Sequence, residues 1–130
     1  MEVREKNHSG GLFPDYVPRI AALARERGNA VLCKRFPVRD NDVPSDAEMT
    51  GILDAIDRGL VDGRVYVHCW GGVGRTGTVV GCWLLRHGHA TRENVLERIA
   101  GLREGEPVRR HRTSPETEAQ QDFVRGWGRR

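Results

Sequence analysis

Long hydrophobic runs are missing from this sequence of 130 residues, and only 6% of its residues are aromatic. No apolar stretch approaches the roughly 20 residues that cross a bilayer. The first residues, MEVREKNHSGG, also lack the apolar segment of a secretory signal. These absences argue against a membrane-spanning or secreted chain, so we expect a cytoplasmic protein without a membrane partner.

Cysteine is scarce as well, with Cys33, Cys69 and Cys82 as the whole complement. An odd number of cysteines without metal-ligand spacing predicts neither a disulfide framework nor a zinc site. We therefore expect reduced thiols and no bound metal. Cys33 and Cys82 lie in apolar segments and are expected to be core residues, and a regulatory disulfide between Cys82 and Cys69 is a minor alternative.

The remaining composition is that of a soluble globular domain, with 38% hydrophobic and 30% charged residues. We expect one domain over residues 1–130, in which residues 1–13 form a loose or partly ordered segment. The net charge is +3, and basic residues gather in REGEPVRRHR (103–112) and in the terminal RGWGRR. Because no aromatic residue interleaves with the arginines of 103–112, we expect no nucleic-acid partner.

Apolar periodicity and capping residues predict helices over 16–27, 46–60, 76–88, 91–104 and 114–127. Ser45 with Glu48 forms a capping box, Gly28 is a stop signal, and Ser114 before Pro115 is expected to cap the last helix. Two apolar runs, AVLCKRFPV (30–38) and GRVYVHC (63–69), are typical of strands. Strands that alternate with helices predict an α/β fold with a small, parallel-type central sheet flanked by helices.

The stretch VYVHCWGGVGRTGT, residues 65–78, places a cysteine, four glycines and an arginine between a predicted strand and a helix. A glycine-rich turn into a helix N-terminus presents backbone N–H groups to an anion. The partial positive charges of these N–H groups also lower the pKa of Cys69. Arg75 adds a planar fork for two phosphate oxygens. We therefore predict a thiolate nucleophile in a phosphate cradle formed by Trp70, Gly71, Gly72, Val73, Gly74 and Arg75.

Two further groups complete this chemistry. The Thr76 hydroxyl is placed to hydrogen-bond the sulfur and make it a better leaving group. An acid must protonate the leaving oxygen, and Asp40, Asp42 and Asp46 follow the first predicted strand. If the two strands are parallel neighbours, their carboxyl ends meet and bring these aspartates to the cysteine loop. The residues alone do not choose among the three.

With both segments in view, the sequence resembles the cysteine-dependent protein phosphatases, the tyrosine and dual-specificity superfamily. HCWGGVGRT fits the signature of His-Cys, five residues and Arg-Ser/Thr, and FPVRDNDVP is similar to the acid loop of that family. The resemblance covers about residues 14–127 and implies that Asp40 is the general acid. It further implies that His68 orients the loop and that Gln120, in SPETEAQQDFV, lies near the hydrolytic water.

The activity implied by this resemblance is hydrolysis of phosphotyrosine, and of phosphoserine or phosphothreonine, in a phosphorylated protein or peptide. The reaction runs through a cysteinyl-phosphate intermediate without metal or cofactor. Compact members of the superfamily carry additional N-terminal strands, and this sequence offers no clear candidate for them. The chain could therefore be a complete catalytic domain, a shortened one or a fragment of a longer product.

Four other interpretations remain at this point. The loop could bind phosphate without turnover, or could serve an inositol phosphate or phosphoinositide phosphatase, although such members often carry lysines that WGGVG lacks. A sulfur-transfer enzyme also begins an anion loop with cysteine, but the aspartate segment and the ending Arg75-Thr76 argue against it. Finally, Cys69 could be a buried core cysteine and Asp40 a turn former. The physiological substrate and the oligomeric state stay open.

Overall fold

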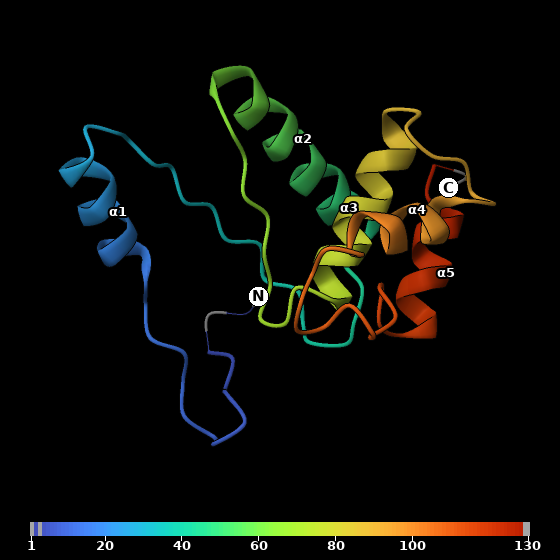
Figure 1. Cartoon of the computed structure of the whole chain (residues 1–130), viewed down its shortest axis with the longest axis horizontal. Helices are drawn as coiled ribbons and strands as arrows, with labels where there is room; N and C mark the ends of the chain where they lie inside the picture. The colour runs from blue at the N-terminus through green and yellow to red at the C-terminus, as the bar shows by residue number, and fades with distance from the viewer. Residues whose placement is uncertain (1, 3, 129–130) are drawn as a thin grey trace. The chain divides into compact units, whose positions relative to one another are not determined.

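The computed structural model describes residue 2 and residues 4–128, and within them it contains five α-helices (Figure 1). The chain divides into two compact units, Met1–Pro37 and Val38–Arg130. The first unit holds α1 (Val17–Glu26). The second holds α2 (Asp46–Asp62), α3 (Gly74–Arg86), α4 (Val95–Leu102) and α5 (Glu118–Gly126). Across the described part of the chain, no helix has the length and hydrophobicity needed to cross a membrane.

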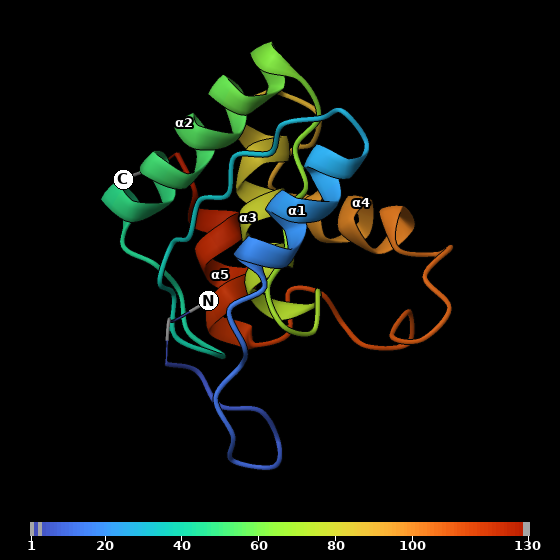
Figure 2. The same ribbon diagram turned by 90° about the vertical axis from the view of Figure 1, so that its left-hand side faces the viewer.

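In the second unit, α3 packs between α2 on one side and α4 and α5 on the other (Figures 1 and 2). The apolar core of these helices includes Met49, Leu53, Cys82, Val95, Ile99, Phe123 and Val124. A Cβ added to Gly81 would lie 2.7 Å from Cγ1 of Val124 and 3.0 Å from Cδ1 of Ile99. Glycine at this position therefore allows α3 to approach α4 and α5 closely.

Polar side chains fix α2 against the C-terminal half of α3. Oδ1 of Asp57 accepts a hydrogen bond from Nε1 of Trp83 at 2.9 Å and lies 2.9 Å from Nε2 of His87. One turn earlier on α2, Asp54 pairs with Nη2 of Arg86 at 2.6 Å. These contacts anchor one end of α3, while its N-terminus points toward the cysteine loop.

The predicted helices are all present, and two of the three expected boundary signals are confirmed. Ser45 and Glu48 form the capping box of α2, and Gly28 has a φ of +68° just after α1. The cap of the last helix was predicted wrongly. Thr117 caps α5 and accepts from the backbone N–H of Gln120, whereas Ser114 lies three residues earlier outside the helix.

The predicted central sheet is wrong. The described residues contain no strand, only an isolated antiparallel bridge between Lys6 and Leu12. Residues 30–38 and 64–68 have no regular secondary structure, and Leu32 and Tyr66 are 80% and 87% exposed. Two candidate strands offer at best a two-stranded sheet, which is marginal in water. The helix packing of the second unit forms a core without a sheet.

Two smaller expectations can also be compared with the structure. Cys82 is buried in the core as expected, but Cys33 is exposed because its segment forms no buried strand. Near the N-terminus, Oδ1 of Asn7 accepts hydrogen bonds from the backbone of Ser9 and Gly11 and so closes a turn. Residues 1 and 3 of the expected loose segment lie outside the described residues.

Candidate active site

The cysteine loop, residues 69–73, leads directly into α3 and forms an open helix N-terminus. Gly72 has a φ of +67°, a left-handed conformation that glycine adopts without steric cost. The N-cap residue of α3 is Val73, whose side chain cannot accept hydrogen bonds from the first helical turn. Such a terminus directs backbone N–H groups and the positive end of the helix dipole at an anion.

Cys69 lies at the start of this loop and is 9% exposed. Burial by itself raises the pKa of the Cys69 thiol. Hydrogen bonds from the Thr76 side chain and backbone and from the Gly72 backbone lower this pKa, as does the charge of Arg75, and the net effect is a pKa below the ordinary thiol value. Cys69 is therefore set up to be a thiolate at lower pH than an ordinary cysteine.

Thr76 follows Arg75 in the first turn of α3. Its hydroxyl oxygen is buried, and among the described residues it makes no hydrogen bond of ordinary distance and angle. It still contributes to the lowered pKa of Cys69. The buried hydroxyl is therefore close enough to Cys69 to stabilise a negative charge on its sulfur.

Arg75 connects the cysteine loop to the segment that carries the predicted acid. Its side chain is 6% exposed, Nη1 donates to the carbonyl of Val38 at 3.1 Å, and Nη2 lies 2.9 Å from Oδ1 of Asp40. Asp40 itself is 62% exposed. The structure thus brings together Cys69, Arg75 and Asp40, which are up to 35 positions apart in the sequence.

Asp40 belongs to a tight turn, residues 39–42, which we call the acid turn. The backbone N–H of Asp42 donates to the carbonyl of Arg39 at 3.2 Å, and Asn41 has a φ of +62°. The carboxylate of Asp42 accepts from the backbone of the following residue, and Asp46 is the first residue of α2. Of the three candidate aspartates, Asp40 is the one that the structure brings to Arg75.

Gln120 lies beneath this site and is fully buried. Oε1 accepts hydrogen bonds from the backbone of Glu116 and Thr117, at 3.1 and 3.2 Å. Nε2 donates to the carbonyl of Asp42 at 3.2 Å. The resemblance implied that this amide lies near a hydrolytic water, and the structure engages it in protein hydrogen bonds.

Sequence reasoning missed Ser114 as a support for the loop. Its hydroxyl donates to the carbonyl of Val73 at 2.7 Å, and the hydrogen bond is buried. A Cβ on Gly77 would also lie 3.2 Å from Cα of Pro115, so the Ser114–Pro115 segment packs closely on α3. Both Ser114 and Thr117 in the sequence SPET could have been the helix cap. The capping-box pattern T-x-x-Q, which begins at Thr117, indicates that Thr117 is the cap and that Ser114 has another role.

His68 and Trp70 flank Cys69. Nδ1 of His68 lies 2.9 Å from the carbonyl oxygen of Cys69, and its ring stacks on Tyr66 with centroids 5.5 Å apart. Trp70 is 48% exposed. His68 thus contacts the backbone of the residue that begins the loop, and Trp70 is half-exposed next to Cys69.

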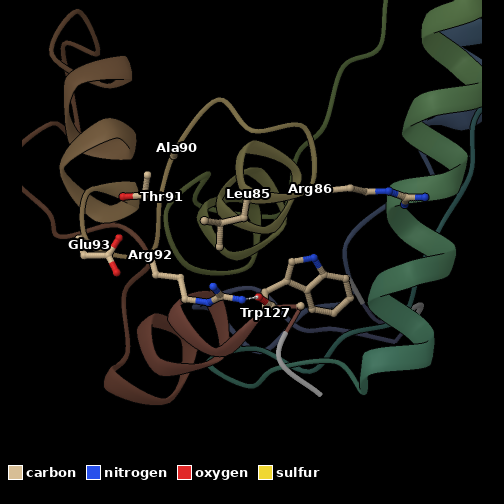
Figure 3. A pocket seen from close by; sticks show the side chains of 8 residues that line it. Leu85, Arg86, Ala90, Thr91, Arg92, Glu93 and Trp127 are labelled. Atoms are coloured by element: carbon tan, nitrogen blue, oxygen red, sulfur yellow. Dashed lines mark hydrogen bonds between the residues drawn. The ribbon is translucent and has the colours of Figure 1, made fainter.

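A cavity of about 510 Å³ lies at the opposite end of α3 and contains none of these residues (Figure 3). Its lining includes Leu85 from α3 and Trp127 from the segment after α5, and Arg92 donates to the carbonyl of Trp127 at 3.1 Å. The candidate site lies instead at the cysteine loop, at the N-terminal end of α3. The described residues contain no cluster of three or more His, Cys, Asp or Glu side chains suited to a metal ion.

Comparison with known proteins matches this chain to phosphatases. Residues 21–124 match the family described as PTP-SAK, the DSP-PTPase phosphatase domain of Swiss Army Knife proteins. The crystal structure of Tk-PTP in the active form superimposes with a TM-score of 0.63 at 29% sequence identity, covering 92% of this chain and 76% of that one.

Shorter matches occur with curated phosphatases. The dual specificity protein phosphatase CDC14B of Mus musculus is 40% identical over 68 residues, or 52% of this chain and 13% of that protein. CDC14C of Symphalangus syndactylus is 38% identical over 64 residues, or 49% of this chain and 12% of that protein. The chain therefore spans 12–13% of the length of these two relatives.

Proposed function

The chain belongs to the DSP-PTPase phosphatase family, and from that premise we propose that it hydrolyses phosphate monoesters of phosphorylated proteins or peptides. The proposed substrates carry phosphotyrosine, and also phosphoserine or phosphothreonine, in the cytoplasm. The observation that carries this proposal is the placement of Cys69, with its lowered pKa, at an open helix N-terminus beside Arg75, which in turn contacts Asp40.

In the first step, the Cys69 thiolate forms a bond to phosphorus while the bond to the leaving oxygen breaks. Asp40 delivers a proton to that oxygen, so that a neutral alcohol or phenol departs. The guanidinium of Arg75 and the N–H groups of the loop stabilise the charge that spreads over the other phosphate oxygens. The product of this step is a cysteinyl phosphate.

In the second step, water attacks phosphorus and the bond to sulfur breaks. The Asp40 carboxylate takes a proton from the attacking water, and the Thr76 hydroxyl stabilises the departing thiolate. Phosphate is released and the enzyme returns to its starting state. The two steps need only the groups of this chain and water, which supports a reaction without added metal.

The test is release of phosphate from a small aryl phosphate by the purified protein in the presence of a metal chelator. We expect turnover by the wild type, inhibition by vanadate, and loss of turnover in Cys69→Ser, because serine is not ionised at neutral pH. Full activity of Cys69→Ser would exclude the proposed nucleophile. Phosphopeptide binding without any release would instead identify a phosphate-binding module.

A further inference from the structure

The acid turn is held by two side chains, Arg75 and Gln120. In the proposed reaction, substrate binding changes the contact with Arg75 but not the contact with Gln120. On one side, Arg75 contacts the carbonyl of Val38 and the carboxylate of Asp40. On the other side, the buried amide of Gln120 donates to the carbonyl of Asp42. In the proposed reaction Arg75 must turn toward the phosphate, whereas Gln120 binds no substrate.

The amide of Gln120 has little capacity left for a water molecule. A side-chain amide offers two acceptor sites on oxygen and two donor hydrogens on nitrogen. In the described residues, both acceptor sites are occupied by the backbone N–H groups of Glu116 and Thr117, and one donor is engaged by Asp42. Because the side chain is 0% exposed, solvent has no access to the remaining hydrogen.

The same amide packs against the start of α3. A Cβ on Gly74 would lie 2.9 Å from Oε1 and 3.1 Å from Nε2 of Gln120. Gly74 follows the cysteine loop directly, so one side chain contacts the base of the phosphate site, the start of α5 and the acid turn. This arrangement links the position of Asp40 to that of the loop.

We infer that Gln120 is a positioning residue, which holds the acid turn in place while Arg75 is engaged by phosphate, and does not orient the hydrolytic water. The inference rests on the proposed function. Its consequence is specific: the loss of Gln120 impairs protonation of the leaving group in the first step.

Gln120→Glu is the informative variant. A carboxylate still accepts from Glu116 and Thr117, and it is favourable at the N-terminus of α5. In its ionised form it has no hydrogen to donate to Asp42, and its negative oxygen faces that carbonyl oxygen instead. Gln120→Met, which keeps the volume and removes every side-chain hydrogen bond, is the second variant.

The matched control is Thr117→Val. This change removes the hydroxyl that accepts from the backbone N–H of Gln120 at 3.2 Å, and so weakens the α5 cap. It leaves the bond from Gln120 to Asp42 intact. A general loss of stability near α5 affects the control as well, whereas loss of the acid turn affects only the Gln120 variants.

The first experiment compares kcat/KM for phenyl phosphate, whose leaving group needs a proton, and dinitrophenyl phosphate, whose leaving group does not. General acids contribute about 10²–10⁴-fold, so we expect Gln120→Glu to lose roughly 10–100-fold on phenyl phosphate and to keep its activity on dinitrophenyl phosphate. In an Asp40→Asn background the same change should have no further effect. Thr117→Val should match the wild type on both esters.

Two outcomes would overturn the inference. One is an equal loss on both esters. The other is an unchanged kcat/KM with a burst of released phenol, which would mean that Gln120 acts on water in the second step. Absence of turnover by the wild type on either ester would refute the proposed function instead.

A second measurement does not depend on turnover. The N–H of Asp42 closes the acid turn, so its hydrogen exchange reports whether that turn is intact. With inorganic tungstate bound at Arg75, we expect protection to persist in the wild type and in Thr117→Val, and to be lost in Gln120→Glu. Equal protection in all three proteins would refute the inference.

Discussion

Nη2 of Arg75 lies 2.9 Å from Oδ1 of Asp40, so the phosphate-binding cation of the proposed reaction is already paired with its proton donor. Arg75 is nearly buried and Asp40 is mostly exposed. The pair therefore joins a buried cation to an exposed carboxylate. In the proposed reaction, an incoming phosphate competes with Asp40 for the guanidinium, and Asp40 then turns toward the leaving oxygen.

Replacing Asp40 with asparagine should strengthen binding of inorganic oxyanions while it slows hydrolysis of esters with poor leaving groups. The change removes both a competitor for Arg75 and a negative charge near the site. An exposed ion pair contributes about 0.2–1 kcal/mol, so we expect the inhibition constant of tungstate to fall by up to about fivefold. Weaker tungstate binding in Asp40→Asn would contradict the idea that the two anions compete.

The lowered pKa of Cys69 predicts the pH at which the thiol reacts. Because the folded-state pKa lies below that of an ordinary thiol, alkylation by iodoacetamide should become fast at a lower pH than for a free cysteine. Thr76→Val removes one of the groups that lower this pKa and should shift the alkylation profile to higher pH. The measurement is made in a Cys33→Ser background, since Cys33 is exposed.

Thr78→Val is the control for this titration. Thr78 is a buried threonine one position after Gly77 in α3, and its hydroxyl donates to the carbonyl of Gly74 at 2.9 Å. Its removal changes the helix without changing the groups that lower the pKa of Cys69. An equal shift in both variants would mean that the Thr76 effect is structural.

Features that depend on short segments could be predicted from the sequence. The capping box at Ser45 and the glycine-rich approach to α3 follow from residue type and spacing. The choice of Asp40 came from the resemblance to the phosphatases. Contacts between residues far apart in the sequence could not be predicted. Gln120 and Asp42 are 78 positions apart, and no local sequence pattern indicates their hydrogen bond.

The sheet shows where local patterns fail. Side chains at residues 65–68 alternate between partly buried and exposed, as in a strand: Val65 and Val67 are partly buried, while Tyr66 and His68 are exposed. A strand, however, needs a partner for its backbone hydrogen bonds, and a pattern within one segment does not supply it. The segment therefore packs one face on the helices without joining a ladder.

Two glycines within helices should respond oppositely to alanine. Gly81 faces Val124 and Ile99 at less than ordinary contact distance, whereas a Cβ on Gly51 meets nothing within 4 Å. We expect Gly81→Ala to lose about 1–3 kcal/mol through overpacking. Gly51→Ala should gain up to about 1 kcal/mol from helix propensity. Denaturant unfolding measures both, and a stabilised Gly81→Ala would contradict the close packing of α3.

The contact of Asp57 with Trp83 and His87 predicts a pH dependence of stability. Burial raises the pKa of Asp57, but hydrogen bonds from Trp83 and His87 and the charges of His87 and Arg86 give a net lowering. A carboxylate with a lowered folded-state pKa stabilises the protein above its ordinary pKa, and this stability is lost as pH falls through the folded-state pKa. We therefore expect the free energy of unfolding to decrease between about pH 5 and pH 2.

Asp57→Asn should make that decrease shallower, by no more than about 1 kcal/mol, because the ion pairs of Asp57 are partly exposed to solvent. The stability curves of the two proteins should then converge at the acid end of the range. Asp62→Asn serves as the control, since it removes a charge from the last residue of the same helix without touching Trp83 or His87. If the free energy of unfolding of Asp57→Asn fell with pH as steeply as that of the wild type, the charge of Asp57 would not be what holds α2 against α3.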